Sequence, residues 1–196
     1  MDDSKPSYLA LGDSYSFGEG VRENERWPTQ LAQKLDWQTP QIIATTGWTT
    51  SELIDGISIS ELDTSYDWIS LLIGVNNQYR GQSIKSYQSD LEILANIMLP
   101  LVRHKSQQVF VISIPDYGIT PFARDKNPQR ISQELSQYNQ INKNFAFQHG
   151  FQYCDITQLS LKAKQNKDYL VDDQLHPSGS MYKIWVDEIL KTCLFS

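Results

Sequence analysis

The sequence predicts an α/β fold in which a five-stranded parallel sheet lies between two layers of helices. Two observations carry this prediction. Five short apolar runs are continuous rather than alternating, as expected for strands covered on both faces, and segments with helical periodicity separate them. Strands that alternate with helices form right-handed crossovers, which produce a parallel sheet. The expected strands are residues 8–11, 42–45, 68–73, 109–114 and 151–154.

The expected helices share apolar residues three or four positions apart, which places those residues on one face. The first begins at Trp27-Pro28, since proline suits the start of a helix. Pro100 is expected to kink or end the third, and the last is expected to start at Pro177. In chain order the patterns are Trp27, Leu31 and Leu35; the weaker segment 51–62; Ile84, Tyr87, Leu91, Leu94, Met98 and Leu101; Ile131, Leu135, Tyr138, Ile141 and Phe145; and Met181, Ile184, Trp185 and Ile189.

Length and composition limit the classes of protein to consider. The 196 residues show no repeat, linker or low-complexity tract, so we expect one domain over 1–196. The formal net charge of −6 argues against a nucleic-acid partner or an anionic membrane surface. No apolar run is long enough to form an integral membrane segment, and the polar residues 1–6 lack a secretory signal, so a cytoplasmic location is expected.

Polar residues follow the first three predicted strands. Because ligands bind beyond the carboxyl ends of parallel strands, these loops are the place to look for a site. Gly12-Asp13-Ser14 follows the first strand, Gly47 lies in the loop after the second, and Asn76 follows the third. Taken alone, each is explained better without chemistry: a turn at Ser14, a loop glycine at Gly47, and a turn or helix cap at Asn76.

The chain has three histidines, and one differs in its surroundings. His104 and His149 lie near predicted helix ends, which favours structural roles. His176 precedes Pro177 and should be extended, with Asp173 close enough in sequence to reach one ring nitrogen. An Asp-x-x-His pair alone would also fit metal binding or helix capping.

These features gain meaning together. A serine hydroxyl is a weak nucleophile that needs a neutral imidazole to take its proton, and the resulting oxyanion needs hydrogen-bond donors. The loops supply Ser14, the Asp173/His176 pair, and donors at Gly47 and Asn76. The order serine, aspartate, histidine also matches that of α/β hydrolases.

Here the sequence resembles the SGNH (GDSL-type) hydrolase family. Gly12-Asp13-Ser14, Gly47, Gly74-Val75-Asn76-Asn77 and Asp173-Gln174-Leu175-His176-Pro177 correspond, in order, to its conserved blocks. Two positions depart from the pattern. Asn77 stands where many members have aspartate, and Gln174 stands where glycine is often found.

The resemblance implies a three-layer α/β/α sandwich with flavodoxin-like topology. It implies that Ser14 is the nucleophile, His176 the base and Asp173 the carboxylate that orients it, with Asp172 a less favoured alternative. The Ser14 and Gly47 N–H groups and the Asn76 side chain would form the oxyanion hole. The implied activity is hydrolysis of carboxylic esters through an acyl-enzyme, and this chemistry needs no metal or other cofactor.

The substrate is the least defined part of the prediction. A small-molecule ester is expected, with Tyr79, Tyr117 and Phe122 as candidate substrate-binding residues in the surrounding loops. Alternatives within the family are a carbohydrate deacetylase, a lysophospholipase or a thioesterase. A further alternative is a catalytically silent, flavodoxin-like binding or interaction domain. The sequence carries no signal for the oligomeric state.

Overall fold

The strands form a single parallel sheet in the order β2-β1-β3-β4-β5. The structure is a computed structural model that describes residues 5–195. The five predicted strands are confirmed, each within two residues of its expected bounds. They are β1 (Tyr8–Gly12), β2 (Gln41–Ala44), β3 (Trp68–Leu72), β4 (Val109–Ile112) and β5 (Gln152–Cys154).

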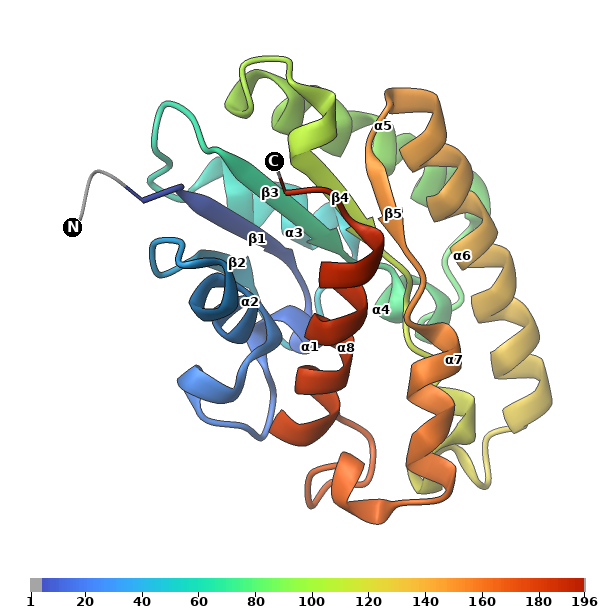
Figure 1. The fold of residues 1–196 in the computed structure, drawn as a ribbon. Helices are drawn as coiled ribbons and strands as arrows, with labels where there is room; N and C mark the ends of the chain where they lie inside the picture. The colour runs from blue at the N-terminus through green and yellow to red at the C-terminus, as the bar shows by residue number, and fades with distance from the viewer. Residues whose placement is uncertain (1–4, 196) are drawn as a thin grey trace.

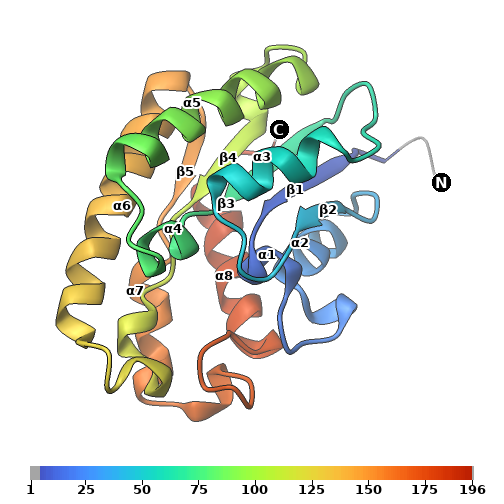
Figure 2. The ribbon, with the colours of Figure 1, turned by 180° about the vertical axis from the view of Figure 1, so that it is seen from behind.

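Helices cover both faces of this sheet, which confirms the three-layer α/β/α architecture (Figures 1 and 2). On one face α2 (Trp27–Leu35) packs beside α8 (Gly179–Thr192). On the other lie α3 (Thr50–Ser58), α5 (Ile84–Leu101) and α6 (Pro128–His149). Strands β1, β3 and β4 are buried throughout, as the continuous apolar runs predict, whereas the outer strands β2 and β5 each have two partly buried residues.

Helix ends follow local capping chemistry, and this corrects one prediction. The last helix begins at Gly179 rather than at Pro177, because Ser178 is its N-cap and accepts a hydrogen bond from Met181 N at 3.4 Å. Pro100 lies within the last turn of α5, which ends one residue later. The weak pattern over 51–62 forms a helix only as far as Ser58.

Short helices at the strand ends were not predicted from the sequence. They are α1 (Ser14–Phe17) after β1, α4 (Val75–Tyr79) after β3, and α7 (Thr157–Ser160) after β5. Single 3₁₀ turns occupy other loops: Glu23–Glu25, Ser106–Gln108, Tyr117–Ile119, Pro121–Ala123, Leu161–Lys164 and Lys167–Tyr169. Because α1 and α4 follow adjacent strands, they bring Ser14 and Asn76 to the same edge of the sheet.

Among residues 5–195, no helix is long and apolar enough to cross a membrane. The same residues contain no group of three or more histidine, cysteine, aspartate or glutamate side chains that could hold a metal ion.

Candidate active site

Ser14 lies where β1 ends, at the first residue of α1. Asp13 caps this helix, since its Oδ1 accepts a hydrogen bond from Tyr15 N at 3.0 Å. Only glycine fits at position 12 without a steric clash, because a Cβ there would lie 2.3 Å from Ser16 Oγ and 2.5 Å from the Leu72 carbonyl oxygen. The turn therefore positions the serine, so the turn and nucleophile interpretations do not exclude each other.

The His176 ring joins Ser14 to Asp173. Its Nε2 is 2.9 Å from Ser14 Oγ, and its Nδ1 is 2.5 Å from Asp173 Oδ2. Tyr15 packs edge-on against the His176 ring at 5.8 Å between centroids and also contacts Trp185 of α8. Ser14 and His176 are buried, at 4% and 8% exposure. The His176 ring is thus held by Ser14, Asp173 and Tyr15.

A tight loop presents Asp173 to the ring. Asp173 Oδ1 accepts hydrogen bonds from Leu175 N at 2.8 Å and His176 N at 2.9 Å, and Val171 N donates to the His176 carbonyl at 2.9 Å. Gln174 has a φ of 61°, in the left-handed region that favours glycine. This conformation explains why glycine suits the position, although the loop forms here with glutamine.

Asp173 is the carboxylate that contacts the ring. Partial burial would raise the pKa of Asp173, but hydrogen bonds from the His176 ring and the loop N–H groups outweigh that effect and lower it. The carboxylate is therefore ionised at neutral pH. No contact joins Asp172, the less favoured alternative, to the ring of His176 among the described residues.

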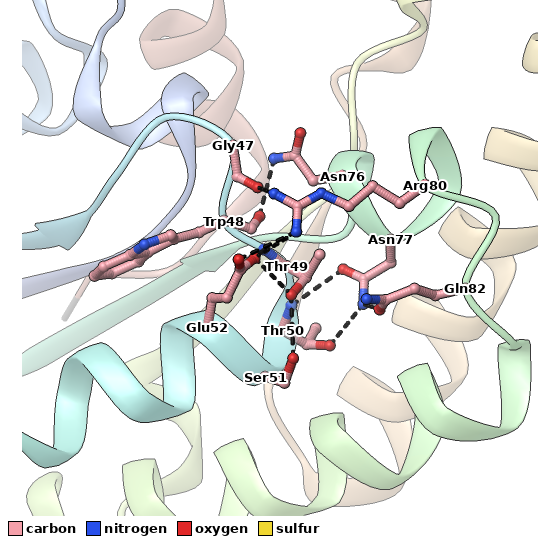
Figure 3. A network of polar contacts seen from close by, with 10 residues as sticks. All are labelled: Gly47, Trp48, Thr49, Thr50, Ser51, Glu52, Asn76, Asn77, Arg80 and Gln82. Atoms are coloured by element: carbon pink, nitrogen blue, oxygen red, sulfur yellow. Dashed lines mark hydrogen bonds and ion pairs between the residues drawn. The ribbon is translucent and has the colours of Figure 1, made fainter.

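The expected oxyanion donors Gly47 and Asn76 lie at the same pocket as Ser14. Gly47 has a φ of 89°, which L side chains rarely adopt, so glycine is favoured there by conformation. Asn76 is the second residue of α4, whose N-cap is Gly74, so the helix-cap explanation for Asn76 is wrong. Its Nδ2 donates to the Trp48 carbonyl at 2.9 Å, which fixes the amide and leaves its second N–H free for another acceptor (Figure 3).

The pocket above Ser14 is small and partly aromatic. Its volume is about 180 Å³. The three aromatic residues expected to bind substrate all line it, with Tyr79 half-exposed and Tyr117 buried. The lining residues are Ser14, Tyr15, Thr46, Gly47, Val75, Asn76, Tyr79, Tyr117, Phe122, Leu175 and His176.

A larger groove adjoins this pocket and shares Tyr79 and Tyr117 with it. We call it the α6 groove, because the first half of α6 forms one wall; its volume is about 470 Å³. Its lining is mostly polar: Gln78, Tyr79, Gly81, Gln82, Ile84, Tyr117, Lys126, Asn127, Arg130, Ile131, Glu134, Gln137 and Tyr138.

Sequence reasoning missed the residues that support the site. Arg80 and Glu52 contact the loop of Gly47, and nothing in their spacing indicates it. Asn77, the departure from the family pattern, is fully buried and accepts from Thr50 N at 3.1 Å. Its Nδ2 donates to Thr50 Oγ1 and Gln82 Oε1, both at 2.8 Å. An ionised aspartate could not donate these bonds, so asparagine is accommodated by a different hydrogen-bond pattern.

Comparisons with known proteins identify the family and the fold. The model of the GDSL-like lipase/acylhydrolase family matches residues 10–184. No curated protein sequence matches the chain. Among solved structures, an acetylxylan esterase from Geobacillus stearothermophilus superposes with a TM-score of 0.69 at 19% identity, covering 97% of this chain and 95% of that one. A putative lipolytic protein of the G-D-S-L family from Desulfitobacterium hafniense gives 0.74 at 14% identity, with 95% and 99% coverage. At these identities the likeness concerns the fold.

Asp13 gives the site an unusual electrostatic feature. Its side chain is fully buried, and no hydrogen-bond partner for Oδ2 lies within the described part of the chain. Burial raises the pKa of Asp13 from 3.8 to about 7, against the effect of hydrogen bonds from the Tyr15 and Gly74 backbone. The folded protein therefore keeps a proton that the unfolded chain loses near pH 4.

This difference predicts how stability depends on pH. The contribution of Asp13 is intact below about pH 4 and is lost as the pH rises toward about 7. At about 1.4 kcal/mol for each pKa unit, the loss amounts to roughly 4 kcal/mol. Asp13→Asn, which keeps a capping side chain without the charge, should remove this dependence. Its gain in free energy of unfolding over wild type should grow from pH 4 to pH 8.

Denaturant unfolding of both proteins across this range measures the effect. Asp125→Asn, at an exposed aspartate, controls for the general loss of a negative charge. A constant difference between Asp13→Asn and wild type from pH 4 to pH 8 would contradict the raised pKa.

Proposed function

This chain belongs to the GDSL-like lipase/acylhydrolase family and acts on ester bonds, and we propose that it does so through an acyl-enzyme on Ser14. One observation carries the proposal: His176 Nε2 lies 2.9 Å from Ser14 Oγ, within reach for proton transfer. Asp173 holds the opposite ring nitrogen at 2.5 Å, which keeps the proton on Nδ1 and leaves Nε2 as the base.

The first half of the reaction transfers the acyl group to the serine. His176 takes the Ser14 proton as Oγ attacks the ester carbonyl, and a tetrahedral intermediate with one negative oxygen forms. When it collapses, the bond from the carbonyl carbon to the alkoxy oxygen breaks, and the alcohol leaves with the proton held by His176. The ionised Asp173 stabilises the transient imidazolium.

Three donors would share the negative oxygen. The Ser14 and Gly47 N–H groups donate no hydrogen bond to another group of residues 5–195, and Asn76 has one N–H that Trp48 does not hold. Donors fixed before the reaction stabilise the oxyanion without a cost for reorganisation. Water then attacks the acyl-enzyme with His176 again as base, which releases the carboxylic acid and restores Ser14.

The size of the pocket favours a short acyl group. A volume of about 180 Å³ lies below the roughly 300 Å³ at which pockets for drug-sized ligands begin. Tyr117 and Phe122 form an aromatic wall of this pocket, with ring centroids 6.4 Å apart. A long alkyl chain would have to leave through the polar α6 groove, so short acyl esters are the proposed substrates.

A second candidate is removal of acetyl groups from a carbohydrate. The α6 groove adjoins the pocket and presents several amide side chains, including Gln82, Asn127 and Gln137. Amides and a half-exposed tyrosine, Tyr79, suit hydroxyl groups and the apolar face of a sugar ring. The acetylxylan esterase with the same fold acts on such a substrate. In this version the acyl group fills the pocket and the sugar lies in the groove.

Substitutions of the adjacent residues Asp172 and Asp173 test the mechanism. Asp173→Asn should lower kcat for 4-nitrophenyl acetate by about 10³–10⁴, because the ring loses its orienting charge. The matched variant Asp172→Asn should stay within a few-fold of wild type, while Ser14→Ala defines the background rate. Equal effects at 172 and 173, or full activity of Ser14→Ala, would contradict the proposed triad.

The dependence of activity on acyl chain length tests whether the pocket accepts only short acyl groups. The kcat/KM for 4-nitrophenyl esters should fall by about tenfold or more from acetyl to octanoyl, because the longer chain has no apolar space. Phe122→Ala opens the wall and should reduce this difference, whereas Phe147→Ala, on an exposed face of α6, should not. A rate that rises with chain length would instead favour a lipid substrate.

The groove tests the second candidate. Gln137→Ala should raise KM for an acetylated xylooligosaccharide about threefold to tenfold and leave KM for 4-nitrophenyl acetate unchanged, because only the sugar reaches the groove. Equal parameters for wild type and variant on the sugar ester would count against carbohydrate binding there.

A further inference from the structure

Arg80 connects the end of α4 to the loop that carries Gly47. It follows α4 directly, and its guanidinium reaches across to the loop after β2 (Figure 3). Nη2 donates to the Gly47 carbonyl at 2.5 Å. Arginine donates in a fixed planar geometry, so this bond constrains the direction of the carbonyl as well as its distance.

Glu52 holds the guanidinium in place. Arg80 Nη1 lies 3.1 Å from both carboxylate oxygens of Glu52. Glu52 Oε2 also accepts from Thr49 N at 2.8 Å and from Thr49 Oγ1 at 2.9 Å, as part of the capping box that begins α3. The backbone N–H of Thr49 and the neighbouring Arg80 lower the pKa of Glu52, so the pair is charged. Arg80, Glu52, Thr49 and Gly47 thus form a closed set of contacts, shown in Figure 3.

The loop needs such support at Gly47. Glycine has more backbone freedom than other residues, and Gly47 occupies a φ of 89°. Two successive carbonyls are held from the α4 side: that of Gly47 by Arg80 and that of Trp48 by the Asn76 amide. Trp48 N also donates to the Thr45 carbonyl at 3.2 Å, which closes a turn over Thr46 and Gly47. The Gly47–Trp48 peptide is thus held at both its carbonyl and its N–H, and this restrains the turn that carries the Gly47 N–H beside Asn76.

We infer that Arg80, held by Glu52, is a positioning residue that fixes the Gly47 backbone so that Gly47 N–H and Asn76 meet the same oxyanion. This inference rests on the proposed function, because it gives Arg80 a role in the tetrahedral state. Arg80 does not itself donate to the substrate. Since both side chains are about half-exposed, at 45% and 40%, the ion pair contributes little to stability. The effect should therefore appear in the reaction rather than in folding.

The central test uses Arg80→Ala with the neutral substrate 4-nitrophenyl acetate. We expect kcat to fall about 10–100-fold with KM within about threefold, because the lost contact acts on the transition state. Affinity for a neutral trifluoromethyl ketone, which forms a tetrahedral adduct with a serine, should fall by a similar factor. Millimolar guanidinium should restore part of kcat in Arg80→Ala and leave wild type unchanged.

Matched variants separate positioning from general effects. Glu52→Gln should give a smaller loss of the same kind, and Arg80→Lys should keep part of the rate because lysine can still reach one acceptor. Arg103→Ala removes another exposed arginine, hydrogen-bonded to Ser65 at 2.7 Å, and should behave as wild type. If Arg80→Ala proves unstable, Glu52→Gln and Arg80→Lys carry the same test.

The outcomes distinguish this inference from the proposed function. If Asn76→Ala loses about 10²–10³ in kcat while Arg80→Ala keeps wild-type kcat and inhibitor affinity, the inference is overturned and the proposed function stands. A loss confined to KM also overturns it, since Arg80 would then bind substrate. If Ser14→Ala keeps wild-type activity, the proposed function fails. In that case a Gly47 amide resonance that is unmoved between wild type and Arg80→Ala overturns the positioning as well.

Discussion

The hydrogen bond between His176 and Ser14 is the contact on which the rest of the site depends. It joins residues 162 positions apart in the chain, at 2.9 Å. In the parallel sheet β1 lies between β2 and β3, and α8 packs beside α2 on one face, so the loop before α8 reaches the end of β1. Both partners are buried, and Tyr15 packs edge-on against the histidine ring. A core that shifted α8 against the sheet would separate them.

Two aspartates near this hydrogen bond, Asp173 and Asp13, have pKa values shifted in opposite directions. Asp173 is partly exposed and receives hydrogen bonds that favour its charged form, so it can stabilise a cationic ring. Asp13, one residue from Ser14, is buried with little compensation and favours its neutral form below about pH 7. In the proposed mechanism, a neutral Asp13 would avoid placing a second negative charge near the oxyanion. The different burial and hydrogen bonding of Asp13 and Asp173 therefore shift the pKa values of these two aspartates in opposite directions.

The sequence predicts the strands, the layers and the residues that meet at the sheet edge, because apolar runs and loop positions depend on local patterns. The family resemblance assigns catalytic roles to these residues, which no single motif supports by itself. It does not predict the Arg80–Glu52 contact or the bond from Asn76 to Trp48, since both depend on how two loops fold against each other. Helix α8 starts at Gly179, two residues after the start at Pro177 that the sequence predicts, because Ser178 is its N-cap. Several adjacent residues can begin a helix, and the surrounding fold decides which of them does.

Covalent labelling tests the central claim most directly, because it asks whether Ser14 is activated by His176 without depending on the natural substrate. Wild-type protein treated with a small organophosphonate should gain one adduct, located by peptide mass spectrometry at Ser14. Labelling of His176→Ala should be slower by orders of magnitude, because the hydroxyl loses its base. Equal labelling rates in the two proteins, or an adduct at another residue, would contradict the account.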